Sequence, residues 1–122
     1  MSTAAAPIHR EDAAWLAGLL DGEGCFDSPR GNPRVRVKMS DLDVVLRAAD
    51  VMGATTYNEN SWREDYKPLM VAQTTGDNAV AVMRAILPWL GSRRSAKVTE
   101  IITAHTAKKA GRIRLVRVER AA

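Results

Sequence analysis

No segment of this sequence limits the possible folds more than residues 15–26, which read WLAGLLDGEGCF. An apolar helical run stops there on two acids, Asp21 and Glu23, each followed by a glycine. Glycine is common where a helix ends, because it adopts backbone conformations that other residues avoid. A carboxylate at such an end either caps the turn or binds a metal ion through its oxygens. The residues alone leave both hypotheses open.

The helix before this turn carries two stripes of different size. It begins near Glu11 or Asp12, since acids favour the positive end of the helix dipole. Leu16, Leu19 and Leu20 have the spacing of a core-facing stripe. A second stripe, built mainly from small residues, consists of Ala14, Ala17, Gly18 and Asp21. Because a helix that is apolar on both sides is buried on both sides, the second stripe can pack against another copy of the same helix.

The length and composition indicate one globular domain of an intracellular, cytoplasmic protein. We expect a flexible leader at residues 1–10, the domain at 11–109 and a basic tail at 110–122. No apolar run reaches the roughly 18 residues that a membrane helix needs, and the first residues do not resemble a secretory signal. The single cysteine, Cys25, excludes an internal disulfide, and one cysteine with two histidines excludes a structural zinc site.

The positive charge is concentrated near the C-terminal end. Residues 105–122 hold six of the 18 lysines and arginines but one of the 14 acids, so the rest of the chain is close to neutral. A basic tail indicates a polyanionic partner, with nucleic acid as the first candidate. A solvated tail without a partner is the alternative that charge by itself does not exclude.

Residues 34–39 alternate strictly between basic and apolar side chains and predict a strand. Val35, Val37 and Met39 point to one face, and Arg34, Arg36 and Lys38 point to the other. Like charges on one strand face repel unless an anion lies across them. A plain solvated face remains possible, but the neighbouring Arg30 and Asn32 favour a nucleic-acid-binding face.

The remaining patterns predict a helix, two strands and two further helices. We expect them at residues 42–52, 54–58, 69–75, 78–87 and 92–109, with Asp77 capping the helix at 78–87. The order α-β-β-α-β-β-α-α contains two antiparallel hairpins separated by helices. It predicts an α+β fold in which helices cover one face of the sheet and the arginines occupy the other.

The segment Leu16–Gly24, LAGLLDGEG, resembles the signature of the LAGLIDADG homing endonucleases. The αββαββα order of that family and the segment LPWLGSRRSAK before the last helix extend the resemblance over residues 11–109. The resemblance implies a saddle-shaped antiparallel sheet. Family members with one motif act as homodimers, so it also implies a dimer interface at Ala14, Ala17, Gly18 and Asp21.

The resemblance implies a divalent-metal site, Mg²⁺ or another divalent cation, at the end of the motif helix. Glu23 takes the position of the metal-binding acid, with the backbone of Gly22 beside it, while Asp21 takes a capping role. A hard cation of this kind prefers carboxylate, phosphate and water oxygens. Arg93 occupies the place of the family's basic active-site residue, with Arg94 and Lys97 as alternatives.

The resemblance makes double-stranded DNA the expected partner and double-strand cleavage the expected reaction. The sheet would lie along the major groove, with no membrane involved. The expected DNA contacts are Arg30, Asn32, Arg34, Arg36, Lys38, Asn58, Asn60, Trp62, Arg63, Lys67, Gln73 and Thr75. By analogy with the family, such a compact single-motif chain suits a mobile element or a phage, and the basic tail would add non-specific phosphate contacts.

Two departures from the family pattern support an alternative function. Arginine at position 93 clamps phosphate but is a poor proton donor compared with lysine. The family's glutamine near the end of the second strand is replaced here by Met39 or Ser40. The alternative is a DNA-binding protein that has lost cleavage, such as a transcription regulator or an RNA maturase-like helper. A third hypothesis is a structural interaction domain whose only functional part is its tail.

Overall fold

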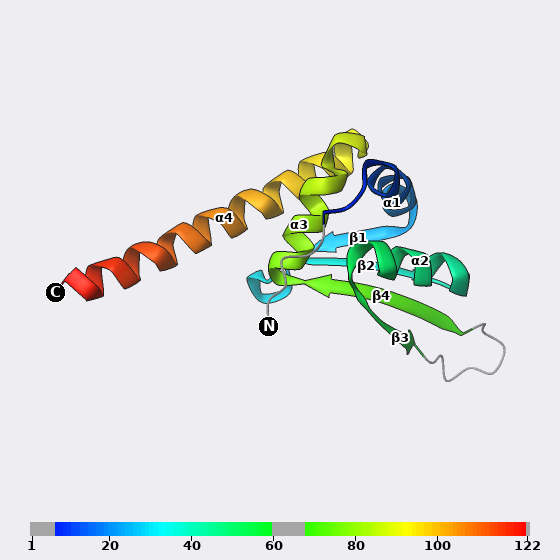
Figure 1. Cartoon of the computed structure of the whole chain (residues 1–122), viewed down its shortest axis with the longest axis horizontal. Coiled ribbons are helices and arrows are strands. Elements are labelled where there is room, and N and C mark those ends of the chain that lie inside the picture. The colour runs from blue at the N-terminus through cyan, green and yellow to red at the C-terminus, as the bar shows by residue number, and fades with distance from the viewer. Residues whose placement is uncertain (1–6, 60–67, 122) are drawn as a thin grey trace.

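A four-stranded antiparallel sheet forms one layer of the protein, and helices pack against one of its faces (Figure 1). The computed structural model describes residues 7–59 and 68–121, with side chains as far as residue 112. Its elements are α1 (Arg10–Glu23), β1 (Gly24–Asp27), η1 (Pro29–Gly31), β2 (Arg34–Met39), α2 (Leu42–Met52), β3 (Thr55–Glu59), β4 (Leu69–Thr75), α3 (Gly76–Ile86), η2 (Leu87–Trp89) and α4 (Ser92–Ala121). The predicted α+β class and the order of helices and strands are confirmed.

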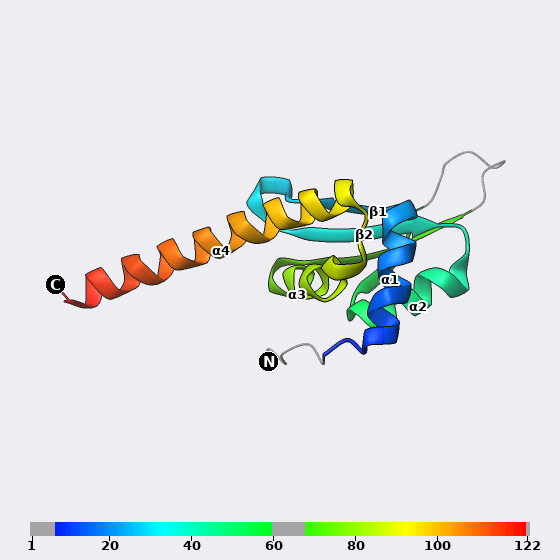
Figure 2. The ribbon, with the colours of Figure 1, turned by 90° about the horizontal axis from the view of Figure 1, so that it is seen from above.

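The strands lie in the order β1-β2-β4-β3, so β2 and β4 occupy the centre of the sheet. Val35 and Val37 are almost completely buried, whereas the residues that alternate with them face the other side. Figure 2 shows α1, α2 and α3 gathered on the covered side. The strict alternation of β2 therefore separates a helix-covered face from an open face, as the sequence predicts.

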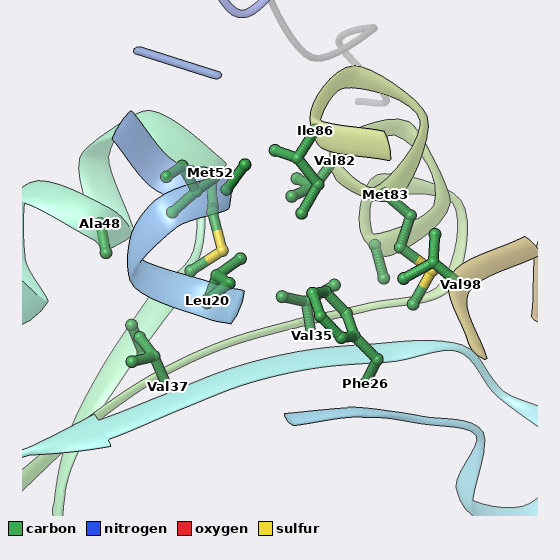
Figure 3. Packing of buried hydrophobic residues seen from close by; sticks show 14 of the residues in the cluster. Leu20, Phe26, Val35, Val37, Ala48, Met52, Val82, Met83, Ile86 and Val98 are labelled. Atoms are coloured by element: carbon green, nitrogen blue, oxygen red, sulfur yellow. The ribbon is translucent and has the colours of Figure 1, made fainter. Parts of the chain in front are cut away.

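The core lies between this covered face and the three helices. Leu16 and Leu20 of α1 are fully buried, and Figure 3 shows Leu20 beside Met52 of α2 and above Val37 of β2. Val98 reaches the same core from α4. Because α1 buries Leu16, Ala17 and Leu20 in this core, its position relative to the sheet is set by tight packing.

The beginning of α3 differs from the prediction. The cap is Thr75, and Gly76 adopts a left-handed backbone with φ of 67° while its N–H donates to the carbonyl of Pro33 at 2.8 Å. Asp77 lies in the first turn, and its carboxylate contacts His105 and Lys109 of α4 at 2.9 Å each. The prediction that Asp77 caps this helix was wrong, because the helix starts at the left-handed Gly76, two residues earlier than expected.

The last helix is longer than expected. The sequence predicts an end near Lys109, but α4 continues to Ala121 and extends far from the rest of the protein (Figure 1). Its buried residues are Val98, Ile101 and Ile102, while residues 106–112 are exposed. Among the residues whose side chains are described, α4 therefore contributes to the core through its first three turns, while later residues such as Lys109 make surface contacts. None of the helices among the described residues is long and apolar enough to span a membrane.

The turn from α1 into β1 depends on the absence of a side chain at Gly24. A Cβ atom there would lie 2.7–2.8 Å from the backbone and side chain of Leu20. Such distances are shorter than van der Waals contact, so a larger residue would force the strand away from the helix. The glycine is needed for this close approach, since its φ of −84° is available to any residue.

We predict that Gly24→Ala lowers the free energy of unfolding by about 1–3 kcal/mol, because the added methyl group overpacks the α1–β1 turn. Urea denaturation followed by circular dichroism measures this change. Gly111→Ala is the matched control, since no atom lies within 4 Å of a Cβ built there. It should leave stability unchanged or raise it by up to about 1 kcal/mol. Equal effects of both substitutions would contradict the close-approach explanation.

Candidate active site and nucleic-acid interface

The two acids of the DGEG turn have different surroundings. The carboxylate of Asp21 accepts hydrogen bonds from the N–H of Gly91 at 3.2 and 3.3 Å. Gly91 directly precedes α4, and a Cβ on it would lie 3.0 Å from the carboxylate. Asp21 therefore satisfies a backbone donor at the positive end of α4, which is a structural use of its charge.

A second hydrogen bond joins the same two helix ends. Arg94 of α4 donates from Nη1 to the carbonyl of Gly24 at 2.5 Å, and its guanidinium carbon lies 5.9 Å from the centre of the Phe26 ring. The Nε atom of Arg94 is buried without a hydrogen-bond partner among the described residues. We call Asp21, Gly24, Gly91 and Arg94 the α1–α4 clamp. It ties both sides of the DGEG turn to the start of α4.

Glu23 is exposed at the last position of α1. No hydrogen bond or ion pair joins its carboxylate to any part of the chain that the structure describes. Nor do the described residues contain a group of three or more histidines, cysteines and acids able to enclose a metal ion. At this turn a single copy of the chain thus presents one carboxylate without a partner among the described residues, and the clamp holds the backbone on either side of it.

The predicted basic residues lie at the start of α4. Arg93 is exposed and lines a shallow hollow with Asp21 and Gly91. Lys97 is also exposed but does not line this hollow, and neither does Glu23. Arg94, considered as an alternative to Arg93, faces inward. The structure brings Arg93 close to Asp21 and uses Arg94 for the clamp.

The proposed dimer stripe on α1 is only partly available. Ala17 is completely buried in the core, so its inclusion in an interface was wrong. Ala14 and Asp21 are half-buried, and Gly18 is exposed with no atom within 4 Å of a Cβ built on it. The same open surroundings apply to Gly22. The α-helical period places Ala17 on the stripe of Leu16 and Leu20, which leaves Gly18 and Gly22 on the outer side.

The open face of the sheet gathers the predicted strand contacts. Paired residues on neighbouring strands share a face, and the register pairs Arg34 with Thr75 and Arg36 with Gln73. The predicted contacts on this face are Arg34, Arg36, Lys38, Gln73 and Thr75. Asn58 pairs with Met70 on the helix-covered side, so the register separates it from the others. Asn60, Trp62, Arg63 and Lys67 lie outside the described residues.

Two cations of the open face have acidic partners. Arg34 forms a two-point ion pair with Asp27, and Lys38 pairs with Glu59 at 3.0 Å. The hydrogen bond from Arg34 lowers the pKa of Asp27 below its ordinary value of 3.8, and the same contact raises the pKa of Arg34. Arg36 has no acidic partner among the described residues. The face is therefore patterned with both signs of charge rather than uniformly basic.

The turn between β1 and β2 lies beside α4. Arg30 has a left-handed backbone with φ of 54°, and both it and Asn32 are exposed. A Cβ on Gly31 would lie 3.3 Å from Nζ of Lys108. This proximity places the predicted turn contacts next to the basic part of α4, although they are far apart in the sequence.

Three contacts at these surfaces were not predicted from the sequence. They are the pairing of Asp27 with Arg34, the inward position of Arg94, and the contact of Asp77 with His105. The pairing of Asp27 with Arg34 had a signal in the sequence. If residues 24–27 and 34–39 form a tight hairpin, Asp27 lies opposite Arg34 on the basic face. The other two join distant segments, and no local pattern indicates them.

We predict that the two acids of the turn differ in their effect on stability. Asp21→Ala should lower the free energy of unfolding by about 1 kcal/mol, because it leaves the Gly91 N–H without its acceptor. Asp21→Asn keeps an acceptor oxygen and should therefore lower the free energy of unfolding by less than Asp21→Ala. Glu23→Ala should stay within about 0.5 kcal/mol of the parent protein. Urea denaturation without DNA or metal measures all three, and equal losses at both acids would contradict the assignment.

Comparisons with known proteins agree with this architecture. No family model and no curated protein matches the sequence. The chain is similar to two crystal structures of the homing endonuclease I-CvuI, one in complex with its target in the presence of Ca and one with the I-CreI target in the presence of Mg, where the DNA is not cleaved. The TM-scores are 0.58 and 0.56 at 19% and 18% sequence identity.

These matches cover 77% and 78% of this chain. In return, the chain spans 65% of the first I-CvuI chain, slightly less than two thirds of its length, and 68% of the second. At such identities the likeness establishes the fold alone. The resemblance noted in the motif helix is confirmed at that level: this chain has the fold of the LAGLIDADG homing endonucleases.

Proposed function

We propose that this protein is a homodimeric endonuclease that binds a specific double-stranded DNA site and cleaves it with a divalent metal ion. The observation that carries the proposal is the exposed carboxylate of Glu23 at the end of the first helix of this fold. Asp21 is bound by Gly91, so Glu23 is the acid of the turn that remains available. The I-CvuI complexes with target DNA in the presence of Ca or Mg support the choice of ligands.

The open sheet face is the proposed DNA-binding surface. The major groove of DNA is about 12 Å wide and admits a two-stranded β-ribbon. The proposed contacts are Arg30, Asn32, Arg34, Arg36, Lys38, Gln73 and Thr75. Each phosphate that a basic side chain neutralises should make the slope of log affinity against log salt concentration steeper by about 0.9.

The residues at the end of α1 suit a hard divalent cation. Such a cation prefers oxygen ligands, and Mg²⁺ is commonly bound by one or two carboxylates together with substrate phosphates and water. Glu23 would supply a carboxylate and Gly22 its backbone carbonyl. The last carbonyls of a helix lack partners within the helix and carry partial negative charge, which further favours a cation there.

Different residues of the chain would have different roles in cleavage. The bound cation would activate water and neutralise charge on the reacting phosphate. The Glu23 carboxylate would bind the cation, while the α1–α4 clamp orients the turn that carries Glu23. Arg93 and Lys97 are exposed at the start of α4, where a cationic side chain can stabilise the phosphate charge that develops during cleavage.

A dimer would complete the site, because the turn of one chain offers one unpartnered carboxylate, that of Glu23, and one active site cuts one strand of a duplex. The outer side of α1, at Gly18 and Gly22, lets another backbone approach closely. Two copies related by a two-fold axis through this side would bring two Glu23 turns to one duplex. Beyond the sheet, the exposed Lys108 and Arg112 of α4 would add phosphate contacts.

A DNA-binding protein without cleavage is the second candidate function. It is favoured by arginine at position 93, because a guanidinium does not transfer protons at neutral pH. Both functions use the same surface, so they differ only in what happens after binding.

We predict that the protein linearises a supercoiled plasmid carrying its selected site in Mg²⁺ but not in EDTA. The site is first obtained by selecting bound duplexes from a randomised pool. Glu23→Gln should bind the same site but cleave at least about 100-fold more slowly, because metal-assisted charge stabilisation is worth several kcal/mol. Glu100→Gln, another exposed acid, is the control and should cleave normally.

Each outcome of this experiment has a separate meaning. Cleavage that survives Glu23→Gln would contradict the active-site assignment. Binding of the selected site without any cleavage in Mg²⁺ or Mn²⁺ would favour the second candidate function. Failure to enrich any duplex from the pool would overturn both.

We predict that the protein is a dimer at micromolar concentration and that Gly18→Arg converts it to a monomer. The large charged side chain would separate the two α1 helices, whereas nothing in a single copy lies within 4 Å of its Cβ. Sedimentation velocity measures the change. Ala104→Arg, at an exposed position of α4, should remain a dimer. A monomeric parent protein would contradict the shared site.

A further inference from the structure

The ion pair between Asp27 and Arg34 lies on the open face of the sheet, at the end of the β1–β2 hairpin. Nε of Arg34 donates to Oδ1 of Asp27 at 2.8 Å, and Nη2 donates to Oδ2 at 2.5 Å. The two residues are directly opposite each other in the strand register. Their neighbours Phe26 and Val35 are buried on the opposite face, so neither side chain can turn into the core.

This contact leaves one edge of the guanidinium group free. Arginine carries five N–H donors in a rigid plane, and the pair with Asp27 uses one on Nε and one on Nη2. Both hydrogens of Nη1 and the second hydrogen of Nη2 make no hydrogen bond to any part of the chain that the structure describes. The unused Nη1–Nη2 edge is a second two-pronged donor, and its plane is set by Asp27.

The free edge has the donor pattern that guanine accepts. In the major groove guanine presents O6 and N7 side by side, and a two-point contact from arginine is the commonest specific contact to it. Resting on the proposed DNA-binding function, we propose that Arg34 reads a guanine in each half of the target site. Asp27 is its positioning residue, because it holds the guanidinium in the plane of the base without touching the DNA.

The pairing argues against a phosphate as the partner of Arg34. A phosphate beside Asp27 would be repelled by the carboxylate and would meet a cation whose charge is already neutralised. A guanine edge carries no net charge, so the carboxylate imposes no such cost. The Asp27 carboxylate is ionised at neutral pH, and the hydrogen bonds from Arg34 lower its pKa further.

The other ion pair on the same face provides a contrast. Lys38 and Glu59 make a single contact at 3.0 Å, and their side chains are 41% and 49% exposed. Arg34 and Asp27 are more enclosed, at 21% and 34%. An ammonium group is a point charge without a fork, so Lys38 cannot select a base by two-point geometry. Restriction of Arg34 before binding also lowers the entropy cost of ordering it on DNA.

The test is the base preference of the protein, measured by sequencing duplexes bound from a randomised pool. The parent protein should prefer guanine at one position of each half-site by about 10–100-fold, as a good two-point contact provides. Arg34→Ala and Arg34→Lys should lose this preference at that position alone. Asp27→Asn should reduce it several-fold, because the arginine remains but its plane is no longer held.

The salt dependence of binding separates base reading from phosphate binding. Arg34→Lys keeps the charge and should keep the slope of log affinity against log salt concentration. Arg34→Ala should also keep it, because Arg34 neutralises no phosphate. Arg36→Ala is the matched control, because Arg36 lies on the same face without an acidic partner among the described residues. It is expected to make the slope shallower by about 0.9 and to leave the guanine preference at the Arg34 position intact. Circular dichroism melts confirm that each variant is folded.

Three results would overturn the inference. Uniformly weaker binding of Arg34→Ala across all sequences, with a slope shallower by about 0.9, would make Arg34 a phosphate contact. Unchanged preference and affinity in every Asp27 and Arg34 variant would make the pair a structural ion pair of the hairpin. If the parent protein enriches no duplex while remaining folded, the proposed DNA-binding function fails, and the inference fails with it.

Discussion

The end of α1 is held by the start of α4 through hydrogen bonds between residues that lie 70 positions apart in the sequence. Asp21 binds the N–H of Gly91, and Arg94 binds the carbonyl of Gly24. Between these two contacts the backbone passes through Glu23. The clamp thereby fixes the backbone from which the exposed Glu23 side chain extends, and the close approach at Gly24 determines how β1 leaves the helix. Every functional proposal for this turn depends on that geometry.

The charged residues divide into those that hold the fold and those that remain available to a ligand. Asp21 and Arg94 belong to the first group, because each makes a hydrogen bond to a backbone group of another element. Glu23 and Arg93 belong to the second, since both are exposed. Arg34 belongs to both, because Asp27 occupies one edge of its guanidinium and leaves the other free. A list of charged residues alone would not distinguish these roles.

The elements of the fold were predictable because each carries a local signal. Residues 34–39 alternate with a period of two, and residues 42–52 end at Gly53, which adopts the left-handed backbone expected after a helix. The errors occurred where several local signals were compatible. Asp77 is as suitable a cap as Thr75, and the small size of Ala17 does not reveal whether it faces the core. Asn58 lies on the covered side because register, rather than residue type, assigns a face.

The sequence by itself determined the motif helix, the two acids in its last turn and the strand with one basic and one apolar face. These features depend on residue spacing, because the hydrogen bonds of a helix and the alternation of a strand involve residues only a few positions apart. Only the tertiary structure decided that Asp21 serves α4, that Arg94 faces inward and that Asp27 holds Arg34. Each of these choices depends on which distant or opposite residue comes within hydrogen-bonding distance. That distance is set by the packing of α1, α4 and the sheet around a shared core.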